Sequence, residues 1–527
     1  MKFQAIKGVR DILPSETDVW NRVEQTARDI FSTFRFAEIR LPIFEQTQLF
    51  VRSIGTDTDV VSKEMFSFDE QGGGALLRAR ENVRNFLTQA QMDQNGVAVF
   101  RGFVDDFIKR REEAIAQGIL EVDRDARDFY QYLLNGVHNL DEVAKAGHWN
   151  DTELIGIIKL IQQAAAYIRI GESLSLRPEA TASVARAYIE HGMQTQPGDV
   201  KLYYIGPMFR RERPQKGRYR QFYQIGAEVL GASDNPRIDA EVIEMLMTFL
   251  DRLQLAGAKL AVNSIGCQQC RPAYVETLRE SLRKVKDRLG ADSQRRIETN
   301  PLRVLDSKLP EEQIIIETLP RVADHLCADC RDHFAQLQEQ LKLRGIGYEI
   351  NWRLVRGLDY YMRTTFEITA PGLGSQDAIC GGGRYDGLVE LLGGPPTKGI
   401  GFAIGTDRLI LSLREAKKAD AAMGVDVCFA WIGAAAYPAA AKLAARLRHA
   451  GFCVELPSEE MKFKKALGLA DRLGARHAII IGEDELAAGV FTIKRLADST
   501  QQKLGESELV AYLSPDGALN RASDRGA

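Results

Sequence analysis

The sequence lacks any long apolar stretch. No run approaches the roughly 18 consecutive apolar residues that a membrane-spanning helix needs, and the first residues, MKFQAIKGVRDILP, lack the apolar core of a signal peptide. We therefore expect neither a membrane span nor export. An excess of charge is also missing: the net charge of −3 comes from 69 basic and 72 acidic residues, which argues against general polyanion binding. Any contact with nucleic acid must come from a local patch.

Cysteine is scarce, with seven residues in a chain of 527. An odd number in so long a chain fits a reducing, cytoplasmic compartment better than a disulfide framework. The composition is otherwise that of an ordinary soluble globular protein, with 45% apolar and 27% charged residues. The length predicts two to four domains with ample core.

The most informative stretch runs from Leu202 to Leu230 and predicts a strand, a basic loop and a second strand. The second strand alternates with a period of two, and its non-core face carries one aromatic, two polar groups and a glycine. The members of that face are Phe222, Gln224, Gly226 and Glu228. Because buried polar groups need partners, this face suggests the floor of a binding site.

The loop between the two strands, Arg210 to Arg220, holds six basic residues and one acid, Glu212. Arginine side chains suit phosphate oxygens through paired hydrogen bonds and a permanent charge. A basic loop alone also fits a solvated hairpin tip. The polar floor beside it favours phosphate or nucleic acid.

Five stretches in order resemble the class II aminoacyl-tRNA synthetases, in the form found in histidyl-tRNA synthetases. FRRERPQKGRYRQFYQIGAE, from Phe209 to Glu228, resembles motif 2, and AEIRLPIFE, from Ala37 to Glu45, resembles motif 1, through which these enzymes dimerise. The sequence LRPEAT, from Leu176 to Thr181, resembles LRPEGT with alanine in place of glycine, which puts only the local backbone angle in doubt. The remaining two are specific to the subgroup: RLVRGLDYY, from Arg353 to Tyr361, and AICGGGRYDG, from Ala378 to Gly387.

Motif 3 follows from Gly399 to Leu409, where a short strand feeds a helix with Arg408 in its first turn. A helix N-terminus and a guanidinium both favour phosphate there. The three glycines of AICGGGRYDG would allow backbone to approach a ligand closely.

The resemblance implies an α+β fold. In it the class II antiparallel sheet is flanked by helices and accompanied by a helical insert, a small insertion domain and a C-terminal α/β anticodon-binding domain. The alanine-rich alternation of strands and helices after residue 424 predicts a small doubly wound domain. The expected boundaries are 1–71, 172–265 and 343–415 for the catalytic domain, 72–171 for the helical insert, 266–342 for the small insertion domain, 424–513 for the anticodon-binding domain and 514–527 for a polar tail.

The family pattern implies a role in ATP binding for several residues. Arg210 and Arg356 would be catalytic and hold the α-phosphate, and Arg408 would hold the γ-phosphate, with Mg²⁺ bridging oxygens. Phe222 would stack on adenine, Glu212 would accept from its amino group, and Arg218 would also bind ATP.

The histidine site is implied in the same way. Glu179 and Thr181 would receive the ammonium group, and Gln224 would lie beside the carboxylate. Glu228 would pair with an imidazole N–H, while Tyr360 and Tyr361 line the pocket. Gln215 would lie near the acceptor end of tRNA(His).

Two cysteine pairs, Cys267/Cys270 and Cys327/Cys330, are each spaced as C-x-x-C. Such pairs match tetrahedral zinc, although reduced free thiols and disulfides remain alternatives. Four cysteines would close the metal shell, which argues against a catalytic metal. The insert 72–171 resembles nothing that we identify; it fits a decorating bundle or a part in tRNA contact or assembly.

The resemblance therefore predicts a homodimeric, ATP-dependent histidine–tRNA ligase that uses L-histidine and tRNA(His). One rival is a catalytically inactive relative that regulates histidine biosynthesis. Such proteins generally lack part of the arginine set and the C-terminal domain, which are present here. The other rival, a synthetase for threonine, proline or glycine, shares motif 3 but not RGLDYY.

Overall fold

The computed structural model describes residues 3–55, 58–69, 173–373, 377–415 and 425–513. Two compact units are present, one formed by Met1–Ile12 with Val19–Ala419 and the other by Leu13–Asp18 with Asp420–Ala527. The predicted helical insert and polar tail lie outside the described residues. Across the part of the chain that is described, no helix has both the length and the apolar character of a membrane span.

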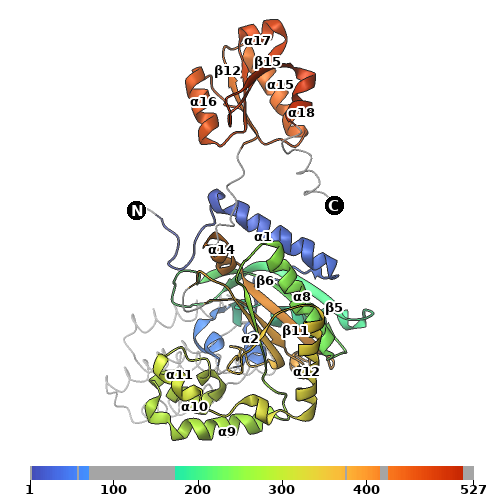
Figure 1. Cartoon of the computed structure of the whole chain (residues 1–527), viewed down its shortest axis with the longest axis vertical. Coiled ribbons are helices and arrows are strands. Elements are labelled where there is room, and N and C mark those ends of the chain that lie inside the picture. The colour runs from blue at the N-terminus through green and yellow to red at the C-terminus, as the bar shows by residue number, and fades with distance from the viewer. Residues whose placement is uncertain (1–2, 56–57, 70–172, 374–376, 416–424, 514–527) are drawn as a thin grey trace, which may run out of the picture. The chain divides into compact units, whose positions relative to one another are not determined.

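An eight-stranded sheet organises the first unit, in the order β1-β5-β6-β11-β10-β9-β7-β8 (Figure 1). The outer pairs β1·β5 and β7·β8 are parallel and all the others are antiparallel, which confirms the antiparallel-dominated sheet expected from the sequence. The strands are β1 (Ala37–Glu38), β5 (Val200–Phe209), β6 (Gln221–Gly231), β7 (Lys259–Ser264), β8 (Glu349–Ile350), β9 (Met362–Thr369), β10 (Ala378–Arg384) and β11 (Lys398–Gly405).

Strand β1 covers only the first two residues of the motif 1 stretch, Ala37–Glu45. Ile39 still donates its N–H to Tyr203 O beyond the end of β1, and the ladder then stops. Pro42, which has no N–H to donate, follows within the same stretch.

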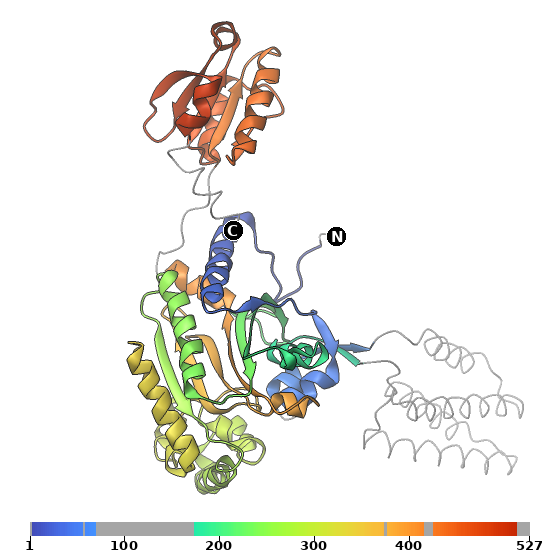
Figure 2. The same cartoon turned by 90° about the vertical axis from the view of Figure 1, so that its right-hand side faces the viewer.

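The alternation of β6 is confirmed. Ile225, Ala227 and Val229 point into the main core, whereas Phe222 and Gln224 face a cavity. Three of the helices that add apolar side chains to this core are α1 (Pro14–Thr33), α8 (Pro236–Arg252) and α12 (Ala328–Leu343), and the last two pack side by side (Figures 1 and 2). The far side of β5 packs against α7 (Thr181–Glu190) and α13 (Leu388–Leu391).

A three-stranded antiparallel sheet, ordered β2-β4-β3, lies in the same unit. It consists of β2 (Phe44–Gln46), β3 (Phe66–Asp69) and β4 (Ser173–Leu176), and is accompanied by α2 (Thr47–Ile54) and a π-helix (Val60–Glu64). Asp69 pairs with Ser173, so the two described ends of the chain that flank the insert are neighbours in one ladder.

The predicted small insertion domain has a core of its own. Its helices are α9 (Arg271–Lys284), α10 (Ala291–Thr299) and α11 (Pro310–Ile316), and the start of α12 completes it. Cys267 and Cys270 lie just before α9, and Cys327 directly precedes α12, which also contains Cys330.

The second unit contains a five-stranded sheet, ordered β13-β12-β14-β15-β16. Only β13, β12 and β14 are parallel, and β15 and β16 add antiparallel, so the expected doubly wound domain is in fact mixed. The elements are β12 (Val427–Trp431), α15 (Ala436–His449), β13 (Val454–Glu455), α16 (Phe463–Arg472), β14 (His477–Ile481), α17 (Glu483–Ala488), β15 (Val490–Arg495), β16 (Gln501–Gly505) and α18 (Glu506–Leu513).

Candidate functional site

A cavity of about 310 Å³ lies over the large sheet of the first unit. Its wall is built from the β5–β6 hairpin, the segment that precedes β9, strand β10 and the start of α14 (Thr406–Glu415). Of the predicted ATP- and histidine-binding residues, only Glu228 is absent from this wall. The others are Glu179, Thr181, Arg210, Glu212, Arg218, Phe222, Gln224, Arg356, Tyr360, Tyr361 and Arg408.

Three arginines from distant parts of the chain meet at this cavity. Arg210 follows β5 and donates through Nε to Pro178 O at 2.9 Å, which holds its side chain beside the LRPEAT segment. Arg408 lies in the first turn of α14, as predicted, and its guanidinium contacts Ala378 O at the start of β10. Burial lowers the pKa of Arg408, and the nearby charge of Arg218 lowers it further.

Arg356, the third arginine, precedes β9. Its Nη1 lies 2.8 Å from Glu367 Oε2, and its Nε, also buried, has no hydrogen-bond partner among the described residues. Burial opposes the charge of Arg356, but the neighbouring Tyr361 and Glu367 outweigh it and raise the pKa.

Glu367 was missed by the sequence reasoning. It lies in β9 and lines the cavity. The sequence offered one sign of it: Glu367 is the single acid of a strand whose other side chains, apart from Arg363, are apolar or carry a hydroxyl.

Phe222 and Glu212 lie together on the arginine side. The guanidinium of Arg210 stands 5.4 Å from the centre of the Phe222 ring, so this ring already carries a cation on one face. Glu212 lies 3.4 Å from Arg218 and 3.7 Å from Arg210. The carboxylate therefore partly offsets the positive charge of the loop.

Another part of the wall is acidic and aromatic. Glu179 is 4% exposed, and its carboxylate accepts from the backbone N–H groups of Thr181 at 2.7 Å and Ala182 at 3.0 Å, so it also caps α7. Burial raises the pKa of Glu179. The Tyr360 hydroxyl lies 3.5 Å from the same carboxylate, and the rings of Tyr360 and Tyr361 lie tilted against each other with centroids 4.7 Å apart.

Gln224 lies on β6 and lines the cavity. Its Oε1 is buried and has no hydrogen-bond partner within the described part of the chain. Such an acceptor is ready for a donor that a ligand supplies.

Glu228 lies behind the wall rather than on it. It is 1% exposed; Thr181 Oγ1 donates to its Oε1 at 2.8 Å and the Tyr385 hydroxyl donates to its Oε2 at 2.6 Å. Burial raises the pKa of Glu228 from its ordinary value of 4.5 to about 8. Glu228 therefore does not itself line the cavity and is linked to it through Thr181, because the period-two pattern gives the face of a residue but not its depth.

Gln215 is exposed at the tip of the basic loop and does not line the cavity. Gln215 and Arg218 form an isolated antiparallel β-bridge, in which Gln215 N donates to Arg218 O at 3.1 Å and Arg218 N donates to Gln215 O at 2.9 Å. The N-terminal segment contacts this loop and also α14. Arg220 N in the loop donates to Gly8 O at 2.7 Å, and Arg10 forms an ion pair with Asp407 of α14 at 3.1 Å.

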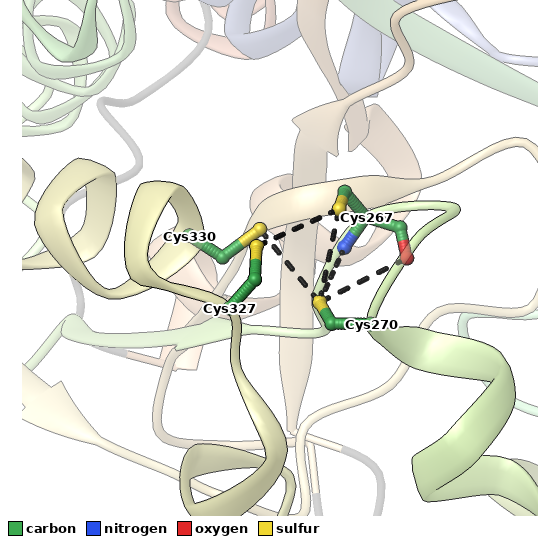
Figure 3. A group of neighbouring side chains, drawn as sticks. All are labelled: Cys267, Cys270, Cys327 and Cys330. Carbon is green, nitrogen blue, oxygen red and sulfur yellow. Dashed lines mark hydrogen bonds between the residues drawn. The ribbon is translucent and has the colours of Figure 1, made fainter.

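The four paired cysteines converge on one point (Figure 3). The Sγ atoms of Cys267 and Cys270 are 3.7 Å apart, and each lies 3.9 Å from a sulfur of the second pair, Cys327 or Cys330. All four sulfurs fall within 4.8 Å of one another. A tetrahedron with metal–sulfur bonds of about 2.3 Å has edges of roughly 3.8 Å, so this spacing fits zinc and not a disulfide.

The backbone around this cluster is shaped for sulfur. Gly266 has φ +73°, and a Cβ there would come within 2.9 Å of Cys270 Sγ. Cys267 N donates to the same sulfur at 3.3 Å. Burial would raise the pKa of Cys267, but the backbone hydrogen bonds from Cys270 and Gln269 outweigh it and lower the pKa to about 7.

Family models cover both units. The model described as histidyl-tRNA synthetase matches residues 169–409, and the one described as anticodon binding domain matches residues 426–515. The chain is 43% identical over 520 residues to the histidine–tRNA ligase of Koribacter versatilis, covering 98% of this chain and 97% of that one. It is 44% identical over 519 residues to the histidine–tRNA ligase of Solibacter usitatus, covering 98% and 100%.

Solved structures agree. The apo histidyl-tRNA synthetase of S. aureus superposes with a TM-score of 0.66 at 30% identity, over 97% of this chain and 100% of that one. A Bacillus halodurans structure titled as an ATP phosphoribosyltransferase regulatory subunit/histidyl-tRNA synthetase has a TM-score of 0.54 at 16% identity, over 92% and 99%. The second likeness concerns the fold alone.

Proposed function

The chain belongs to the histidyl-tRNA synthetase family and is an ATP-dependent histidine–tRNA ligase, and from this premise we propose which of its groups carry each step. The rival of an inactive regulatory subunit is not favoured, because curated ligases match nearly the whole chain at about 40% identity. A synthetase for another amino acid is likewise not favoured.

In the first step the carboxylate of histidine attacks the α-phosphate of ATP, which gives histidyl-adenylate and releases pyrophosphate. Arg210 and Arg356 hold the α-phosphate, and Arg408 holds the γ-phosphate. Catalysis here is mainly alignment of the in-line attack and neutralisation of charge on the phosphates. Phe222 stacks on adenine, while Glu212 and Arg218 bind the rest of the nucleotide.

Histidine lies on the acidic side of the cavity. Its ammonium group meets Glu179 and Thr181, its carboxylate lies near Gln224, and its ring packs against Tyr360 and Tyr361. The Thr181 hydroxyl is hydrogen-bonded to Glu228 at 2.8 Å, so Glu228 fixes a group that meets the ammonium. Glu228 is also the partner proposed for the imidazole N–H, and analogues that lack this N–H lose a partner in a buried site.

In the second step the 3′-hydroxyl of the terminal adenosine of tRNA(His) attacks the activated carbonyl of the adenylate. The exposed Gln215 at the tip of the basic loop contacts this acceptor end. The second unit, which matches the anticodon-binding family, contacts the other end of the tRNA.

Two metals accompany this function. Zinc fits the four cysteines, since the soft thiolate donors and the sulfur spacing both suit a closed structural site. Mg²⁺ would neutralise triphosphate charge when bound, and Glu367 is a carboxylate on the arginine side that can hold such a hard cation.

A homodimer completes the proposal. The motif 1 strand, β1, is the edge of the large sheet, and both of its residues are exposed. In the smaller sheet the rings of Phe44 and Phe68 meet edge to face while 49% and 44% exposed. Two exposed aromatic rings in contact support an interface with a second copy, which light scattering of the purified protein would detect as a doubled mass.

A reducing, cytoplasmic compartment suits this chemistry. All seven cysteines carry free thiols, and four of them are the proposed metal ligands. Thiolate ligands of this kind persist where disulfides do not form.

The convergence of Arg210, Arg356 and Arg408 on a single cavity carries the assignment of roles. Histidine-dependent exchange between ATP and pyrophosphate tests it. We expect exchange with histidine alone among the amino acids, and a loss of at least about 100-fold in R356M. Full exchange by R356M would remove Arg356 from the reaction.

A further inference from the structure

The cysteine cluster touches the segment that builds the histidine pocket. Cys267 follows Gly266, and Gly266 O accepts from Arg363 N at 2.8 Å, while Ile265 N donates to Arg363 O at 2.9 Å. These two bonds extend the β7–β9 ladder from Ser264 up to the first cysteine. The residues directly before Arg363 include Tyr361 of the cavity wall.

A second link is made by Arg271, the first residue of α9 and the residue that follows Cys270. Its Nη1 donates to the backbone O of Tyr361 at 2.5 Å. The guanidinium therefore joins the turn that carries two of the sulfurs to the backbone of a pocket residue.

The two regions also share one hydrophobic core. Cys267, Cys270 and Cys330 pack in the same cluster as Tyr361, and the partly buried Tyr360 lies against it. A change in the spacing of the sulfurs is thus transmitted through close-packed side chains.

We propose that the four-cysteine metal centre, acting through Arg271, positions Tyr361 and so sets the affinity for histidine. Arg271 is a positioning residue, because it does not line the cavity. The inference rests on the zinc site proposed above, and it adds a role in the first reaction step to a site that would otherwise only stabilise the fold. Without the metal the two C-x-x-C turns would separate, and Arg271 would no longer hold Tyr361 in place.

Three full-length variants test the role of Arg271: R271M, R271K and the matched control R283M. Arg283 lies on the same helix, but its guanidinium pairs with Glu298 at the surface. Zinc per chain and the KM values for histidine and ATP in the exchange reaction are measured for each. We expect R271M to keep about one zinc per chain, to raise the KM for histidine about tenfold and to leave the KM for ATP within about twofold. R271K should recover part of the loss, and R283M should match the unmodified protein.

Equal losses for histidine and ATP, or none, in a zinc-bearing R271M would overturn the positioning role. If R271M does not fold, R271K provides the test of the positioning role. Lysine is shorter than arginine and should hold the backbone of Tyr361 less well, so the KM for histidine must still rise.

Removal of the metal tests the other half of the inference. Titration calorimetry of histidine into the chelator-treated full chain should show about tenfold weaker binding, with recovery on adding zinc. Undiminished binding by the metal-free chain would contradict it. If the purified protein holds no metal, the zinc site fails, while R271M still judges Arg271 by itself.

Discussion

At the scale of single residues, the shape of the site depends on a missing side chain. A Cβ on Gly381 of β10 would lie 1.8 Å from an Nη of Arg356 and 2.2 Å from its Cζ. The glycines were expected to let backbone approach a ligand. At Gly381 the space is instead taken by the guanidinium that faces the ligand.

We predict that G381A abolishes adenylate formation without unfolding the protein. The added methyl meets only the far end of a flexible side chain, so Arg356 moves away rather than the strand. Exchange should fall about 100-fold, while the melting temperature changes by only a few degrees. G347A, where a Cβ would meet nothing within 4 Å, is the control and should be fully active. Normal exchange by G381A would show that the position of Arg356 matters little.

Burial raises the pKa of Glu228 to about 8, against the opposing effect of its hydrogen bonds with Tyr385 and Thr181, so the carboxyl is mostly neutral in the folded protein near pH 7. In the unfolded chain the same carboxyl has its ordinary pKa of 4.5 and is ionised. Between these values the folded state holds a proton that the unfolded state lacks. Raising the pH across this window therefore lowers the free energy of unfolding, and above about pH 8 the effect ends.

The corresponding prediction concerns E228Q, which removes the titrating group and keeps its size. From pH 5 to pH 8 the melting temperature of the unmodified protein should fall more steeply than that of E228Q. E311Q, which alters an exposed glutamate, should follow the unmodified protein. Parallel profiles for the unmodified protein and E228Q would mean that Glu228 is already ionised in the folded state.

Residues that face the ligand could be predicted, because Arg210, Tyr361 and Arg408 belong to motifs that are visible in the sequence. The residues that hold these side chains in place could not be predicted. Glu367 and Arg271 act through contacts with residues 11 and 90 positions away, on other elements. No local pattern reports such pairs.

At the scale of elements, the β3–β4 pair determines how the insert is attached. Asp69 and Ser173 are direct partners across the ladder, so the two described ends of the chain on either side of the insert meet at one place. Strands joined this way need only a short turn to connect them.

We therefore predict that replacing residues 72–171 by a short turn leaves histidine-dependent exchange within about threefold of the full chain, since loops of any length close this pair at modest cost. Comparing exchange with aminoacylation in this variant separates two possibilities. Loss of aminoacylation alone would assign the insert to tRNA. Loss of exchange from a protein that still folds would contradict the prediction and give the insert a direct role in the first step.

Elements with strong periodicity were predicted well. Strand β6, expected from its alternation with a period of two, runs from Gln221 to Gly231, and α14 begins at Thr406, so Arg408 lies in its first turn as expected. The π-helix Val60–Glu64 was not predicted, because its bonding pattern depends on neighbours: Glu64 O accepts from Arg211 N of the basic loop.

At the scale of the whole molecule, the two units have separate cores. The cavity is lined only by residues of the first unit. A chain that ends at Glu415 should accordingly keep exchange within about threefold and lose aminoacylation by about 100-fold or more, through weaker tRNA binding. Filter binding of tRNA would confirm the cause. Equal loss of both activities would show that the second unit supports the cavity.

The family resemblance predicted the architecture of the first unit because five motifs fix the order of its strands. The mixed sheet of the second unit was harder to predict. The apolar residues of β15 do not indicate whether it pairs parallel or antiparallel, and β16 has no apolar face, since Gln501, Gln502 and Lys503 are exposed. Even the connection does not give the direction away: α17 separates the antiparallel neighbours β14 and β15, whereas a short turn joins β15 to β16.

A crystal structure of the full chain with ATP and histidinol, a histidine analogue that lacks the reacting carboxylate, tests the central claim most directly. The account predicts the triphosphate among Arg210, Arg356 and Arg408, with adenine on Phe222 and the imidazole against Tyr361. A nucleotide bound elsewhere, or one that leaves any of these three guanidinium groups without a phosphate contact, would contradict it.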